Sequence, residues 1–171
     1  MVDSPVRQAP QIIVAVQDGP VTAVDLDWPG ACGGECVFLG RTREENHGAF
    51  GPLVRLEYEV YGPMAKKVLG KMAEEAAEKF GCRAVRIVHA QGAVKPGEAS
   101  VVIQVATPHR GDAFAACNYL IDRVKHDLPV WKREVWRGGE TFVEGCCAGH
   151  GERLAGRSDD GAPDGGMDHD G

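Results

Sequence analysis

The chain has 171 residues, of which 43% are hydrophobic and 26% charged, and its formal net charge is −6 at pH 7. This length is about that of one ordinary domain of ~150 residues, large enough to bury a core without disulfides or a structural metal. The negative charge argues against a general nucleic-acid binder, because phosphate contacts need a basic surface. The apolar stretch at residues 12–16 is far shorter than the ~20 residues of a membrane span. Since the first ten residues also lack the pattern of a signal peptide, we expect a cytoplasmic protein with no membrane partner.

The end of the chain differs in composition from the rest. Residues 146–171 carry six acidic and two basic side chains, a net charge of −4, which leaves −2 for the preceding residues. The segment is rich in glycine and has almost no large apolar side chain, so it cannot bury enough surface to offset the entropy of ordering. We predict one folded domain over residues 1–145 and a disordered acidic tail over residues 146–171.

The first half of the domain alternates between strand and helix patterns. Strands are predicted at residues 11–16, 35–39 and 53–60, with a polar, glycine-containing and mobile loop at 41–52. A helix opens at Gly62-Pro63, where the missing N–H of proline costs nothing, and ends at Gly81. Its apolar residues recur every four positions and predict a buried stripe: Met64, Val68, Met72, Ala76 and Phe80.

The second half continues in the same way. A helix is predicted from about Arg110 to Asp127, before Pro129, which bars its continuation. Its apolar stripe is Phe114, Cys117, Ile121, Val124 and Leu128. Strands are predicted at residues 83–89, 100–106, 130–135 and 141–143, with turns at 96–97 and 138–139. Two helices among about seven strands, mostly joined as hairpins, predict an α+β fold with antiparallel pairing.

Four polar segments are candidates for chemistry. The sequence FLGRTR delivers Arg41 and Arg43 to the start of the predicted loop, and TPHR places His109 and Arg110 at a helix start, where backbone N–H groups favour anions. The other two are Lys125, near the end of the same helix, and Lys132 in the following strand PVWKRE, which the turn at Pro129 could bring close to Lys125. Each has a simpler interpretation: solvated lysines, a solubilising loop, a capping histidine, and core positions for Phe38 and Trp131.

The six cysteines are scattered and do not form the framework of a small secreted protein, so free thiols are expected. Cys36 and Cys117 lie on apolar faces and are expected to be buried and inert. Cys146, Cys147 and His150 raise the alternative of a metal-handling protein. Adjacent cysteines make a poor tetrahedral site and no CxxC pair completes it, so we predict neither a metal nor a cofactor.

Taken together, FLGRTR, LEYEVYGPMA, VHAQGAVKPGEASVVIQVATPHRGDAF and LIDRVKHDLPVWKRE resemble the large, catalytic subunit of molybdopterin synthase in order and spacing. The resemblance runs from about residue 36 to residue 143. Upstream of Gly33 it is poor, because family members usually have a helix where this chain has the loop-like DGPVTAVDLDWPGACGG.

The resemblance implies an α/β hammerhead-type fold and a homodimer that binds a small ubiquitin-like sulfur-carrier subunit at each end, giving a heterotetramer. It also implies that the Gly-Gly thiocarboxylate of the carrier enters a pocket and transfers sulfur, in two rounds, to cyclic pyranopterin monophosphate. The product is the dithiolene of molybdopterin. By position, Lys125 and Lys132 match the two essential lysines of the family. The implied substrate-binding residues are a pocket aromatic, a loop arginine and two phosphate contacts: Phe38, Arg43, His109 and Arg110.

This assignment fits the residues, because both substrates are anions and a cluster of Arg, Lys and His supplies the required electrostatics. The partner supplies the sulfur, so no nucleophilic cysteine is needed. We expect Lys125 to be the acid/base group and Lys132 to stabilise charge. Arg110 and Lys125 would lie roughly 22 Å apart on one helix, so serving one substrate would require two chains. The alternative function is a docking module for a ubiquitin-like carrier without catalysis.

Overall fold

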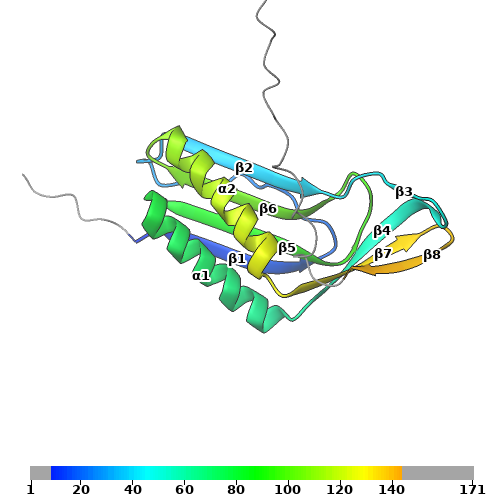
Figure 1. Ribbon diagram of the computed structural model, residues 1–171. Helices are drawn as coiled ribbons and strands as arrows, with labels where there is room; N and C mark the ends of the chain where they lie inside the picture. Colours follow the sequence, from blue (N-terminus) through cyan, green and yellow to red (C-terminus); the bar gives the residue numbers. More distant parts are fainter. Residues whose placement is uncertain (1–8, 144–171) are drawn as a thin grey trace, which may run out of the picture.

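The computed structural model describes residues 9–143, so the predicted tail at residues 146–171 lies outside them (Figure 1). The elements in chain order are β1 (Gln11–Asp18), β2 (Gly34–Arg41), β3 (Asn46–His47), β4 (Gly51–Val60), α1 (Gly62–Phe80), β5 (Ala84–Val94), β6 (Ala99–Thr107), α2 (Arg110–Asp127), β7 (Val130–Trp136) and β8 (Gly139–Val143). Neither α1 nor α2 combines the length and apolarity that a membrane crossing needs.

The strands form a large sheet with a smaller one projecting from it (Figure 1). The large sheet has the order β2-β6-β5-β1, and both helices lie on one face of it. The end of β5 pairs with β4, which pairs in turn with β7, and β8 completes the small sheet. The predicted α+β, α/β hammerhead-type fold is therefore confirmed. One pairing departs from the antiparallel expectation: β1 runs parallel to β5, which a long intervening stretch of chain makes possible.

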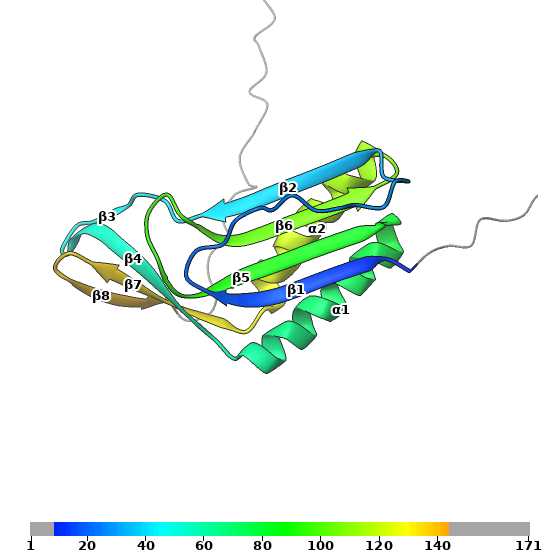
Figure 2. The same ribbon diagram turned by 180° about the vertical axis from the view of Figure 1, so that it is seen from behind.

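The opposite face of the large sheet is crossed by residues 19–33, which form neither helix nor strand (Figure 2). Gln104 holds this segment, accepting a hydrogen bond from the Val24 N–H at 3.2 Å and donating to the Val24 carbonyl at 2.9 Å. Arg86 donates to Gln104 Oε1 at 2.8 Å and to the Thr22 carbonyl at 3.2 Å. The prediction that this region has no helix is therefore confirmed. The side chains of Arg86 and Gln104, from two strands of the sheet, hold it in place.

Helix α1 begins and ends where the sequence predicts. Gly81 adopts φ 65° and its N–H donates to the Ala77 carbonyl, a termination that glycine allows. Met72 and Ala76 are buried as expected, but Met64 is 52% exposed, so its assignment to the core is wrong. The buried stripe runs one position later around the helix: Ala65, Leu69, Met72, Ala73, Ala76 and Ala77.

Helix α2 has the predicted bounds, yet Phe114 is 63% exposed and its assignment to the buried stripe is wrong. Ala113 lies on the buried side of α2, and Phe114 is one step around the helix from it and outside. The buried set is Ala113, Ala116, Cys117, Leu120, Ile121 and Val124. Trp131 is also exposed, at 55%, because it points away from the face of β7 that meets the core.

Candidate functional site

One end of α2 forms an open pocket of about 350 Å³, lined by Gly33, Pro108, His109, Arg110 and Gly111. His109 is the residue that precedes the first turn of the helix, and its side chain makes no capping hydrogen bond. His109 therefore occupies the N-cap position through its backbone carbonyl, which accepts from the Asp112 and Ala113 N–H groups, and its ring is left available to a ligand. The ring and the exposed Arg110 side chain lie at the positive end of the helix dipole, so the pocket suits a phosphate or a carboxylate.

Two glycines that sequence reasoning missed bring this pocket together. A Cβ at Gly34 would lie 2.8 Å from the Cα and backbone N of Arg110, and one at Gly33 would lie 2.6 Å from the Pro108 carbonyl oxygen. The start of β2 thus runs against the start of α2 at a distance that only glycine permits. The Thr107 hydroxyl fixes the turn by donating to the His109 carbonyl at 2.7 Å. The signal in the sequence for this close contact is the pair of adjacent glycines immediately before a predicted strand.

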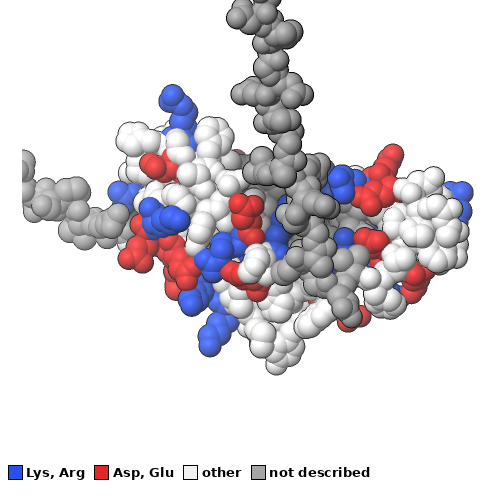
Figure 3. All heavy atoms as spheres, in the orientation of Figure 1, with Lys and Arg blue, Asp and Glu red and all other residues white. Residues whose placement is uncertain are grey.

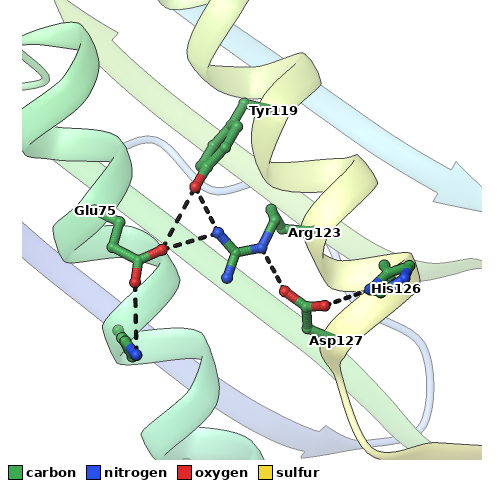
Figure 4. Close-up of polar contacts among 6 residues, drawn as sticks. Glu75, Tyr119, Arg123, His126 and Asp127 are labelled. Carbon is green, nitrogen blue, oxygen red and sulfur yellow. Dashed lines mark hydrogen bonds and ion pairs between the residues drawn. The ribbon is translucent and has the colours of Figure 1, made fainter.

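The other end of α2 carries Lys125, which is exposed in the last turn of the helix. This turn is held by the polar network of Figure 4, in which Arg123 contacts Glu75 of α1 at 2.9 Å and also pairs with Asp127. Hydrogen bonds from His126 and Arg123 lower the pKa of Asp127. Lys125 itself has an interaction partner. The network joins the helices and fixes the backbone from which Lys125 extends.

Lys132 lies on β7, on the face opposite to Trp131, as the alternation in the sequence predicts. Its Nζ lies 3.1 Å from Glu134 Oε1, and the two side chains are 26% and 17% exposed. The register places Lys132 directly opposite Tyr58 of β4, whose ring meets the buried His89 edge-on at 5.3 Å. Lys132 is therefore a partly buried cation held by a carboxylate.

Arg43 follows β2 and is 84% exposed, with its guanidinium 2.8 Å from Glu45. Phe38 is partly buried and packs against the core beside Gly40. Residues 41–52, which are expected to form a mobile loop, are more ordered than predicted, because β3 pairs with the start of β4. His47 stacks on Phe50 at 4.8 Å between ring centroids.

The predicted site residues fall into two groups within one chain. β2 and β6 are antiparallel with Gly34 opposite Thr107 and Arg41 opposite Ala99, so His109 and Arg110 lie at one end of the large sheet. Arg43 lies beyond the opposite end of this sheet. Helix α2 runs toward that end, so Lys125 in its last turn lies there too, and Lys132 follows on β7 in the small sheet (Figure 1). The structure does not bring all these cations into one pocket of one chain.

The described cysteines are all free thiols. Burial raises the pKa of Cys82 to about 11 and that of Cys117 to about 12, which keeps both thiols protonated at neutral pH. Cys117 is buried as expected, whereas Cys36 is only partly buried. Among residues 9–143, no three metal-binding side chains gather into a possible site. The Cys146, Cys147 and His150 combination lies outside these residues.

The helix-bearing face of the molecule has no single sign of charge. Basic and acidic side chains are interspersed on the part of this face that the structure describes (Figure 3). This mixture suits small anionic ligands held by individual cations better than a long polyanion, which needs a continuous basic surface.

Known proteins are similar to the chain over most of its described length. The family model described as MoaE protein matches residues 16–127. The chain is 42% identical to the molybdopterin synthase catalytic subunit of Bacillus subtilis over 107 residues, covering 63% of this chain and 67% of that protein. It is 38% identical to the corresponding protein of Pyrococcus abyssi over 123 residues, covering 72% of this chain and 82% of that protein.

Solved structures agree. Molybdopterin synthase from Staphylococcus aureus matches with a TM-score of 0.65 and 32% identity, covering 78% of this chain and 96% of that chain. Molybdopterin cofactor biosynthesis protein E from Burkholderia multivorans matches with a TM-score of 0.63 and 30% identity, covering 81% of this chain and 91% of that chain. A complex of subunits 1 and 2 of the molybdopterin-converting factor from Helicobacter pylori, at 18% identity and a TM-score of 0.61, shares the fold. The chain belongs to the MoaE protein family.

Proposed function

We propose that this chain is the catalytic subunit of a molybdopterin synthase, a sulfurtransferase that acts in the cytoplasm. It takes sulfur from the thiocarboxylated C-terminus of a small ubiquitin-like carrier subunit and transfers it to cyclic pyranopterin monophosphate. The observation that carries the proposal is the open pocket at the start of α2 in a chain of this family. Arg110 and the ring of His109, which makes no capping hydrogen bond, lie there at a helix N-terminus. A phosphate ester is the ligand that such a pocket fits.

The remaining cations suit the other half of the reaction. Lys125 extends from the last turn of α2 and acts as the acid/base group, while Lys132, held by Glu134, stabilises the charge that develops as sulfur is transferred. Arg43 is accessible to bind an incoming carboxylate or thiocarboxylate. The partly buried Phe38, which lies outside the pocket at the start of α2, is the aromatic group that we assign to the entry of the carrier tail. Protonated, buried thiols at Cys82 and Cys117 favour a route in which the partner supplies sulfur.

The two groups of cations form one working site when two copies of the chain associate. His109 and Arg110 of one copy then lie beside Lys125, Lys132 and Arg43 of the other. An isologous dimer produces two such sites, and two carriers complete a heterotetramer. The exposed Phe114, one turn along α2 from Arg110, is an apolar group that such an association would cover. The Helicobacter pylori neighbour is itself a complex of two different subunits.

The alternative is a module that binds the carrier without catalysis. Both functions predict binding, but only the enzyme forms product, so mixing the chain with a thiocarboxylated carrier and the cyclic pterin separates them. Lys125→Ala should lower turnover by orders of magnitude with little change in carrier affinity, which marks a residue needed in the transition state. Lys66→Ala, an exposed lysine on α1, is the matched control and should retain full turnover. Near-normal turnover of Lys125→Ala would remove Lys125 from the mechanism.

A further inference from the structure

The ion pair at Lys132 is the end of a longer chain of contacts on β7 and β8. The indole Nε1 of Trp136 lies 2.8 Å from Thr141 Oγ1, and this oxygen lies 3.0 Å from Glu134 Oε2. The other carboxylate oxygen, Oε1, lies 3.1 Å from Lys132 Nζ. Four side chains are therefore linked in series, from a tryptophan of the core to the lysine proposed to act on the substrates.

The chemistry of the groups fixes the direction of every proton in this series. An indole N–H can only donate, so Thr141 accepts from Trp136 and its single hydroxyl proton is left to donate to Glu134. Ionised Glu134 can only accept, and it does so from the hydroxyl through one oxygen and from the ammonium group through the other. No alternative arrangement satisfies all four groups, so the hydroxyl determines how the carboxylate is turned.

The middle of the series and its tryptophan end are anchored. Glu134 and Thr141 are directly opposite in the β7–β8 ladder, so the backbone sets their separation. Trp136 is 6% exposed, and its ring lies 5.3 Å from that of His47 in the segment that follows Arg43. The pair of Lys132 and Glu134 is much less exposed than the pair of Arg43 and Glu45 at 84% and 41%. Solvent therefore screens the Lys132 pair less, and its geometry is better defined.

We propose that Thr141 is a positioning residue, which orients the Glu134 carboxylate and thereby holds the Lys132 ammonium group at the place where charge develops. This role rests on the proposed function of Lys132. A lysine side chain has four rotatable bonds, and a carboxylate that is itself fixed limits them before the substrate arrives. Without the Thr141 hydroxyl, Glu134 would lose one of its two partners and Lys132 would sample more conformations.

The test uses variants of the full chain mixed with thiocarboxylated carrier and cyclic pterin. Thr141→Val keeps the shape and the β-branched side chain but removes the hydroxyl, whereas Thr141→Ser keeps the hydroxyl. Thr141→Val should lower kcat about tenfold with little change in the KM for the carrier, the loss expected for one hydrogen bond to a charged group. Thr141→Ser should restore most of the wild-type kcat, which a merely structural role would not predict. Thr141→Ala is a second variant in case valine does not fold there.

Two further readouts separate the possible failures. The indole N–H resonance of Trp136 should shift in Thr141→Val and stay near its wild-type position in Thr141→Ser, whether or not the chain is active. The double variant Thr141→Val/Glu134→Gln should have a kcat little lower than that of Glu134→Gln alone, because both residues act through the position of Lys132. A wild-type chain without activity would overturn the proposed function and this role with it. An active wild type with wild-type kcat in folded Thr141→Val or Thr141→Ala would overturn the positioning role alone.

Discussion

Arg110 is the first residue of helix α2 and Lys125 lies in the last turn of the same helix. At 1.5 Å per residue, roughly 22 Å of helix separates their backbones. A pterin monophosphate is too short to contact both ends of such a helix. Within one chain the two residues therefore serve different sites, and they serve one substrate only when they come from different chains.

This relationship predicts complementation between two inactive variants. Arg110→Ala and Lys125→Ala should each be inactive alone, because each lacks one half of every site. Mixed dimers contain one site with both residues intact, so activity should return as subunits exchange. The measurement is turnover over time after mixing, alongside mass spectrometry of the dimers to establish exchange. Complete exchange without activity would show that each chain has its own complete site.

Gly34 predicts a local effect on the phosphate pocket. Gly34→Ala places a Cβ 2.8 Å from the backbone of Arg110, so the start of α2 must move. We expect weaker binding of the cyclic pterin, measured by calorimetry, with carrier binding little affected. Gly30→Ala is the matched control, because its Cβ would meet nothing within 4 Å. Equal pterin affinities for the two variants would contradict the assignment of this pocket.

Two residues of α1 test the description of the core. Leu69 is fully buried, so Leu69→Ala should lower the free energy of unfolding by about 2–5 kcal/mol, through lost burial and the cavity left behind. Met64 is 52% exposed, and Met64→Ala should change the free energy of unfolding by no more than about 0.5 kcal/mol. Urea denaturation of the two variants and the wild type measures these free energies. Similar losses would mean that Met64 is buried after all, as its spacing suggested.

The buried His89 predicts how stability depends on pH. Burial lowers the pKa of His89 below its ordinary value of 6.5, while its Nδ1 lies 2.7 Å from the Ala90 carbonyl oxygen. Below pH 6.5 the unfolded chain binds a proton that the folded chain does not. His89 therefore costs stability as the pH falls from 6.5 toward its folded pKa, by at most about 1.4 kcal/mol per pH unit.

The comparison with His89→Phe isolates this contribution, because phenylalanine keeps a ring beside Tyr58 and does not titrate. The difference in free energy of unfolding between variant and wild type should shift in favour of the variant as the pH is lowered from about 7.5 to about 5.5. A difference that stays constant over this range would mean that His89 titrates alike in the folded and unfolded chains.

Much of the fold could be predicted because local signals agree with it. Pro63 and Gly81 bound α1, and Pro129 follows α2, so both helices have the expected limits. Because successive side chains of a strand point to opposite faces, Lys132 and Trp131 lie on opposite faces of β7, as expected. The sequence could not reveal which flank of a helical stripe faces the sheet, because that depends on contacts with strands far away in the sequence. Met64 and Phe114 were misassigned for this reason.

The site was only partly accessible to sequence reasoning. His109, Arg110, Lys125 and Lys132 stand out as cations next to a helix end or turn, and their types suit anionic substrates. The contacts that support them involve residues with no such signal. The approach of Gly34 to Arg110, and the path from Trp136 through Thr141 to Glu134, depend on strand register, which no single segment encodes.

In the proposed mechanism, the sulfur that this chain transfers belongs to its partner. The most direct measurement uses a carrier whose thiocarboxylate contains heavy sulfur, mixed with the unlabelled chain and cyclic pyranopterin monophosphate. Mass spectrometry of the product then identifies the source of its sulfur. Under this mechanism, both sulfur atoms of the dithiolene carry the label. Absence of product, or a product that contains unlabelled sulfur from the chain's own cysteines, would contradict it.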